Sequence, residues 1–163
     1  MLERDMTGTI AIQQAGRDDA SWLEGFGSTP DDDWPRQFDE QDKGTRLIFI
    51  LLRDGVKAGY AIFNRAPRYA LFQRLGMPEI QNLYILPSFR RHGLARALIA
   101  RCEEQARLEG FSQIGIGVGL HSGFGPAQRL YAGLGYQPDG NGVTYDRTIV
   151  AAGERVAVDD NLS

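Results

Sequence analysis

Residues 83–97 read LYILPSFRRHGLARA, and this stretch decides the fold of the chain. Its first four residues are apolar and Pro87 follows them, which predicts a strand that ends there because proline cannot donate to a β-ladder. A turn rich in arginine comes next, and Gly93 stands where a long amphipathic helix begins. The first turn of a helix leaves backbone N–H groups unpaired and carries a partial positive charge. The stretch therefore predicts a strand, a turn that binds an anion, and a helix.

The residue types of this turn suit a pyrophosphate group. Gly93 allows the backbone to approach a ligand closely, and Ala95 keeps a nearby position small. Arg90, Arg91 and Arg96 add positive charge, so the turn needs no metal ion to hold phosphates. We therefore expect a ligand that carries a diphosphate.

Length and composition indicate one globular unit. The chain has 163 residues, of which 42% are hydrophobic, which is enough for one core and too few for two domains of ordinary size. The formal net charge of -3 opposes nucleic-acid binding, which needs a basic surface. Acidic residues concentrate at residues 31–42, which indicates either an affinity for a cationic acceptor or a solvated loop. We expect a single domain over residues 1–163 and no nucleic-acid partner.

The sequence offers neither a disulfide nor a membrane span. Cys102 is the single cysteine, and we expect it to pack as a small apolar residue of the long helix. No stretch approaches the ~20 apolar residues that a spanning helix needs, and residues 1–5 do not resemble a secretory signal. These features predict a cytoplasmic protein without a membrane partner.

The spacing of apolar residues predicts an alternation of strands and helices. Residues 9–13 alternate like a half-buried strand, residues 15–26 show helical spacing, and residues 46–65 predict a hairpin that turns at Asp54-Gly55. Further predicted elements are a loop or short helix anchored by Trp34 and Phe38, helices at 69–75, 91–109 and 126–134, strands at 79–86, 113–118 and 143–150, and a possible edge strand at 155–158. This order predicts a mixed α/β (α+β) sheet flanked by helices.

The same order of features resembles the GNAT superfamily of acyl-CoA-dependent N-acetyltransferases. The resemblance rests on the RxxGxA motif at residues 90–95 and on residues 127–136, AQRLYAGLGY, which follow the next helix and strand. It is clear over residues 79–136 and reaches back to Thr9 through the order of elements. The family implies a centrally splayed sheet of about six or seven strands flanked by helices.

The resemblance implies that acetyl-CoA is the acyl donor and that it binds at the opening stretch. N–H groups from about residue 91 to residue 96 face the pyrophosphate, and the splayed strand pairs with the pantetheine arm. An unpaired N–H in that gap bonds the thioester carbonyl and stabilises the developing oxyanion. The implied cofactor-binding residues are Leu83, Tyr84, Ile85, Arg90, Arg91, His92, Gly93, Leu94, Ala95 and Arg96.

The resemblance also implies catalytic roles for Tyr131 and Glu79. The Tyr131 hydroxyl would protonate the leaving thiolate, and a buried core tyrosine is the structural alternative. Glu79 would take the proton of the acceptor amine. The alternative is that Glu79 is a solvated carboxylate at the end of the strand and that a bound water carries the proton. His121 is a weaker candidate, because a single histidine at a strand end is often structural. Phe124 departs from the asparagine that the family often carries seven residues before the tyrosine, and Ser122 or a water could replace that contact.

These features together predict an enzyme that moves an acetyl group from acetyl-CoA to a primary amine of a small molecule or peptide, by direct attack in a ternary complex. The loop near Trp34 and Phe38 and residues 69–75 are the expected acceptor wall. The alternative is a non-catalytic acyl-CoA sensor or interaction module. A nucleotide-binding protein is disfavoured, since the sequence has no GxxxxGKS or GxxxxGKT loop. We expect no metal, and either a monomer or a homodimer.

Overall fold

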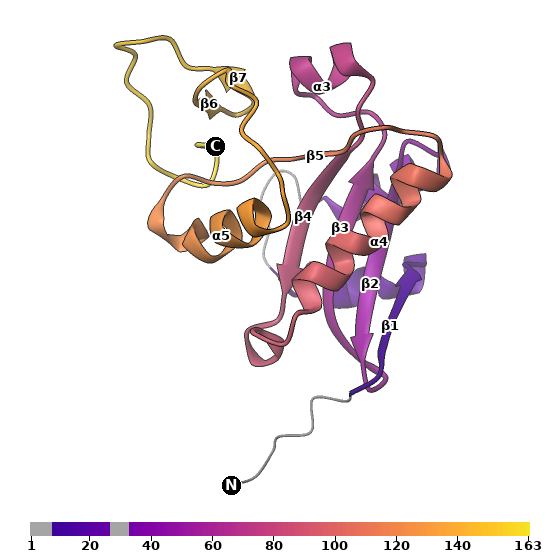
Figure 1. Ribbon diagram of the computed structural model, residues 1–163. Helices are drawn as coiled ribbons and strands as arrows, with labels where there is room; N and C mark the ends of the chain where they lie inside the picture. Colours follow the sequence, from indigo (N-terminus) through magenta and orange to yellow (C-terminus); the bar gives the residue numbers. More distant parts are fainter. Residues whose placement is uncertain (1–7, 27–32) are drawn as a thin grey trace, which may run out of the picture.

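The computed structural model describes residues 8–26 and 33–163, and Figure 1 shows how their elements are arranged. The strands are β1 (Ile10–Gln14), β2 (Arg46–Arg53), β3 (Val56–Asn64), β4 (Glu79–Ile85), β5 (Gly115–Ile116), β6 (Thr144–Tyr145) and β7 (Thr148–Ile149). The helices are α1 (Ala20–Glu24), α2 (Trp34–Asp42), α3 (Ala70–Leu75), α4 (Leu94–Leu108) and α5 (Gly125–Gly133). Strands β1 to β5 form one sheet in sequence order, with β4 and β5 parallel and the other neighbours antiparallel, and β6 and β7 form a separate hairpin. The predicted mixed α/β fold is confirmed. None of the described helices is long and apolar enough to cross a membrane.

The hairpin of β2 and β3 lies at the centre of the sheet and confirms the prediction for residues 46–65. Arg53 faces Val56 across the turn. Asp54 and Gly55 have φ angles of 51° and 78°, the left-handed values that a two-residue hairpin turn requires at both positions. The middle of both strands is buried, as expected for a sheet that is covered on both faces.

Helices cover both faces of the sheet, and Figure 1 shows α4 crossing one of them. Leu94, Leu98 and Cys102 belong to the cluster that packs α4 against β2, β3 and β4. The other face packs against α1 and α2, where Trp34 and Phe38 are each 1% exposed. The prediction that Cys102 is a core residue is confirmed, since it is fully buried and this burial raises the pKa of its thiol to about 12.

The sheet opens between β4 and β5. Only the first two residues of β4, Glu79 and Ile80, have partners on β5. The register between β3 and β4 shifts just beyond them, and Asn82 has a φ of 50°, so β4 carries a bulge that bends it. The strand expected at residues 113–118 is therefore reduced to β5, and the splayed sheet is confirmed.

The C-terminal part differs from the sequence prediction. One strand was expected at residues 143–150, but the structure has the short hairpin of β6 and β7 there. Its turn residues Asp146 and Arg147 have φ angles of 43° and 66°, and a left-handed backbone cannot continue a strand. The possible edge strand at residues 155–158 is wrong, because those residues are not in a strand and Leu162 bridges to β6 instead.

An ion pair at the C-terminal end of α4 provides a test of how this helix is held. Arg65, directly after β3, donates from Nε and Nη2 to the carboxylate oxygens of Glu109 at 2.7 and 2.5 Å. Its Nη1 donates to the Gly44 carbonyl oxygen at 2.8 Å. Glu109→Gln should therefore lower the free energy of unfolding at pH 7 by about 1–2 kcal/mol, measured by urea denaturation.

The effect of this substitution should depend on pH with a defined sign. The hydrogen bonds from Arg65 hold the pKa of Glu109 below its usual value of 4.5. The carboxylate therefore stabilises the fold fully above that value, and the contribution is lost as the pH falls through the lowered pKa. Glu104→Gln is the matched control, because Glu104 pairs with an exposed Arg107 on the same helix and should matter little. Equal losses in the two variants would contradict a particular role for the Arg65 contact.

Candidate functional site

The turn before α4 has the geometry of an anion site. Gly93 precedes the helix with a φ of 74°, and Leu94 anchors this end in the core at 2% exposure, with Ala95 half-buried beside it. No backbone N–H of residues 91–96 has a hydrogen-bond partner within the described ranges, whereas the next residue already donates to the Gly93 carbonyl oxygen. A run of main-chain donors is therefore available at the positive end of the helix dipole.

The cationic side chains of this turn divide into two kinds. Arg90 braces the turn, since its Nε donates to the last carbonyl oxygen of β4 at 3.0 Å and its guanidinium lies 5.5 Å from the ring centre of Tyr84. Arg91, His92 and Arg96 are exposed and form no ion pair with the described part of the chain. These three side chains can therefore face a bound polyanion.

The outer edge of β4 faces the gap that opens toward β5. Tyr84 and Ile85 pair with β3 on one side. On the other side, Leu83, Tyr84 and Ile85 have no strand partner among the residues that the structure describes. A chain that carries amide groups can pair with such an edge as another strand would.

Tyr131, on α5, lines a cavity of about 1210 Å³ between β5, α3, α5 and the β6–β7 hairpin. Its hydroxyl makes no hydrogen bond to any described residue, and burial raises its pKa to about 12. A protonated hydroxyl in this state can donate to a group that enters the cavity. Glu79 lines the same cavity, but the anion turn at residues 91–96 does not. The anion turn and the cavity therefore lie toward opposite ends of β4.

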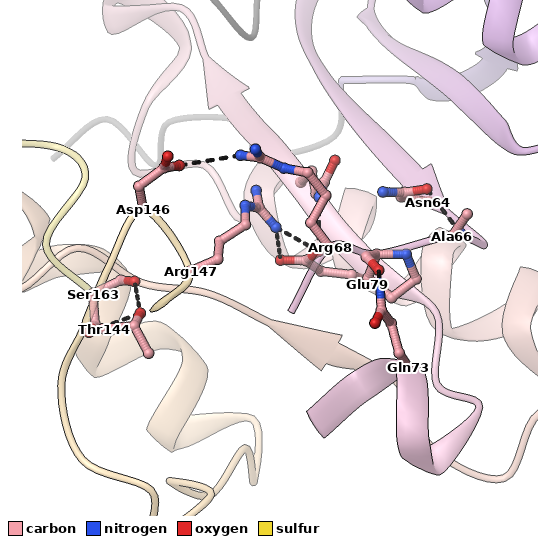
Figure 2. A network of polar contacts seen from close by, with 11 residues as sticks. Asn64, Ala66, Arg68, Gln73, Glu79, Thr144, Asp146, Arg147 and Ser163 are labelled. Atoms are coloured by element: carbon pink, nitrogen blue, oxygen red, sulfur yellow. Dashed lines mark hydrogen bonds and ion pairs between the residues drawn. The ribbon is translucent and has the colours of Figure 1, made fainter. Parts of the chain in front are cut away.

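Glu79 begins β4 and is only 4% exposed. Figure 2 shows Arg147 reaching from the β6–β7 turn to this carboxylate, and its Nη1 lies 2.9 and 2.8 Å from the two oxygens. Nε2 of Gln81 donates to Oε2 at 2.7 Å. The alternative of a solvated strand-end carboxylate is therefore wrong, while the role of general base stays a prediction. Sequence reasoning missed Arg147, because no local pattern connects it to a residue 68 positions earlier.

His121 and Phe124 are held in contacts with one another. Nδ1 of His121 accepts a hydrogen bond from the Gly123 N–H at 3.1 Å, and Nε2 lies 2.7 Å from a carboxylate oxygen of Asp160. Both ring nitrogens are thus engaged, which argues against a proton-accepting role. The ring of Phe124 lies 4.7 Å from that of His121 and fills the space beside Gly119. Position 124, where the family often carries an asparagine, therefore holds an aromatic side chain that packs against His121.

The expected acceptor wall is only partly where the sequence placed it. Trp34 and Phe38 are themselves buried in the core, and the loop before them at residues 27–32 lies outside the described residues, so that part of the expected wall stays a prediction. Tyr69 and Phe72, from the α3 segment, do line the cavity. The Tyr69 hydroxyl donates to Asp139 at 2.5 Å, which ties α3 to the segment after α5.

Comparison with known proteins gives an independent result. The sequence profile of the acetyltransferase (GNAT) family matches residues 15–136. A search of curated proteins found no match. The solved structure of aminoglycoside N-acetyltransferase AAC(6')-Iy in complex with CoA is similar, with a TM-score of 0.65 and 19% identity over 85% of this chain and 93% of that chain.

Two further solved structures share the fold. Aminoglycoside 6'-N-acetyltransferase AAC(6')-IG from Acinetobacter haemolyticus has a TM-score of 0.67 and 16% identity, over 90% of this chain and 99% of its own. A ribosomal-protein-alanine N-acetyltransferase from Brucella melitensis biovar Abortus 2308 has a TM-score of 0.61 and 20% identity, over 80% of this chain and 94% of its own. The profile match spans the anion turn, the splayed strands and Tyr131. The chain therefore belongs to the GNAT acetyltransferase family and is an acyltransferase.

Proposed function

We propose that this chain, as a single N-acetyltransferase domain, transfers an acetyl group from acetyl-CoA to a primary amine of a small molecule or peptide. The observation that carries the proposal is the run of unpaired N–H groups at residues 91–96, at the end of the strand that separates from β5. A diphosphate fits such a helix start without a metal ion. A similar solved structure, that of AAC(6')-Iy, is a complex with CoA.

The proposed donor lies along β4, with its diphosphate at the turn and its pantetheine arm on the outer edge of the strand. Seven residues of strand provide a track of about 20 Å between the turn and the cavity. A main-chain N–H that faces the gap donates to the thioester carbonyl oxygen as negative charge develops there, which is worth about 3 kcal/mol. The proposed donor-binding residues are Leu83, Tyr84, Ile85, Arg90, Arg91, His92, Gly93, Leu94, Ala95 and Arg96.

The proposed reaction is a direct attack of the acceptor nitrogen on the thioester carbonyl carbon. A C–N bond forms, the C–S bond breaks, and the departing sulfur takes the proton of the Tyr131 hydroxyl, which is then replaced from solvent. The nitrogen loses its proton to Glu79 or to a water. Nη1 of Arg147 lies 2.9 and 2.8 Å from the two Glu79 oxygens, so a proton taken up by Glu79 would weaken this ion pair.

A non-catalytic acyl-CoA sensor is the second candidate, and the aromatic packing of Phe124 in place of the expected asparagine favours it. Calorimetry with CoA, followed by an assay of thiol release from acetyl-CoA over a panel of amines, separates the two functions. We expect CoA binding and release with at least one amine. Tight CoA binding without release on any amine would favour the sensor, and the absence of CoA binding would contradict both.

Gly93→Val tests the anion turn. The φ of 74° is strained for a β-branched residue, so the turn must move although no heavy atom lies within 4 Å of the added Cβ. We expect CoA affinity to fall at least about 10-fold in calorimetry, because such strain costs about 1–3 kcal/mol. Gly110→Val is the matched control, since Gly110 has a φ of 83° at the other end of the same helix. That variant should lose stability and keep its CoA affinity. A CoA affinity of Gly93→Val equal to that of the wild type would count against the position of the turn.

Tyr131→Phe tests the proposed proton donor. Turnover should fall about 100-fold while CoA affinity stays nearly unchanged. Because burial raises the pKa of Tyr131 to about 12, the wild-type rate should show no decline from loss of this proton up to pH ~10. Tyr136→Phe is the control, since that hydroxyl donates to Glu103 at 2.9 Å and has no proposed role in the reaction. Unchanged turnover in Tyr131→Phe would remove this residue from the mechanism.

A further inference from the structure

The contact between Arg147 and Glu79 forms under unfavourable local conditions. The Glu79 side chain is 6% exposed and that of Arg147 is 25% exposed, so both charges lose much of their hydration. The backbone at Arg147 is left-handed, as is that of Asp146 before it, and neither residue has the freedom of glycine. A two-residue turn of asparagine and glycine would form this hairpin with less strain. Stability alone therefore does not explain why an arginine occupies this turn.

Arg147 uses only part of its hydrogen-bonding capacity. A guanidinium has five N–H donors, and Nη1 makes both contacts with Glu79. Nε and Nη2 have no partner in the described ranges, and Arg147 lines the cavity that also contains Glu79 and Tyr131. Nε and Nη2 present the pair of parallel N–H groups that matches the two oxygens of a carboxylate.

The other charged side chains of the cavity are already engaged. The only other guanidinium of the described lining, that of Arg107, is 69% exposed and pairs with Glu104. The carboxylates other than Glu79 have partners too: Glu103 and Asp139 accept from tyrosine hydroxyls, Asp146 pairs with Arg68, and Asp160 is held by His121. Among the charged side chains of the described lining, Arg147 is therefore the half-buried one that still has unused N–H donors.

We propose that Arg147 selects the acceptor by binding a carboxylate that the acceptor carries close to its amine, so that α-amino acids are the preferred class. In this arrangement the acceptor carboxylate meets Nε and Nη2 of Arg147, and its ammonium lies beside the carboxylate of Glu79. Each charge of the zwitterion then faces its opposite in the existing ion pair. The inference rests on the proposed acetyl transfer and names the substrate class for the same site.

The test compares α-amino acids with their carboxamides, which differ in the negative charge and keep the amine. Initial rates of thiol release from acetyl-CoA should give a KM at least about 10-fold lower for the acid of the best pair in the wild type. In Arg147→Gln the difference in KM between acid and amide should disappear, and any change in kcat should be common to the two substrates. Because each variant is judged by its own ratio of acid to amide, a general loss of activity cancels.

Arg68→Gln is the matched control, since Arg68 pairs with Asp146 in the same turn but does not line the cavity. It should keep the full preference for the acid. Thermal melting and CoA calorimetry check the folding of both variants, and the comparison of acid with amide in the wild type needs no variant. In addition, the deaminated acid of the best substrate should compete with the acceptor in the wild type and lose at least about 10-fold in affinity in Arg147→Gln.

Two results would overturn the inference while leaving acetyl transfer intact. If the amides have the same KM as the acids in the wild type, no carboxylate is recognised. If polyamines are preferred over amino acids, the acceptor is cationic. If the protein binds CoA but none of the amines tested causes thiol release, the acetyl transfer itself is overturned and this inference with it.

Discussion

The site depends on the fact that the hydrogen-bonded ladder between β4 and β5 stops after two residue pairs. Backbone groups in a sheet are normally paired, because an unpaired polar group away from water is costly. The bulge at Asn82 bends β4 away from its parallel neighbour after two residue pairs, while β3 keeps the strand in place on the other side. One edge of a well-supported strand is thus left without a partner. The free edge of β4 that runs from the cavity to the anion turn follows from that opening.

The two ends of β4 are supported in different ways. The turn at its C-terminal end stands on the core, since Leu94 and Leu98 fix α4 against the sheet. The cavity at its other end is enclosed by segments that add little to the core, because Thr144 is the one buried residue after Gly119 in the described sequence. Elements with few buried contacts open at low free energy. The anion turn is therefore built on the rigid part of the molecule, and the cavity on the part that adjusts most easily.

Sequence reasoning succeeded where the determinants of structure are local. The Asp54-Gly55 hairpin, the long helix after Gly93 and the splayed strand follow from turn chemistry, periodicity and the family pattern, and the structure contains all three. It failed where distant segments decide. The anchoring of α2 by Trp34 was expected, but the face of the sheet that buries it is made from other segments and could not be named from the local sequence. Arg147 was missed because its partner on β4 is defined only in the folded chain.

The proposed site would bind its donor through main-chain groups and its acceptor through side chains. In the proposed arrangement main-chain N–H groups recognise the diphosphate, so most side chains around them can change as long as the left-handed turn remains possible. The proposed acceptor recognition depends instead on the side chain of Arg147, carried by the short hairpin outside the main sheet. A change of one hairpin residue can therefore alter the acceptor while the donor site stays the same.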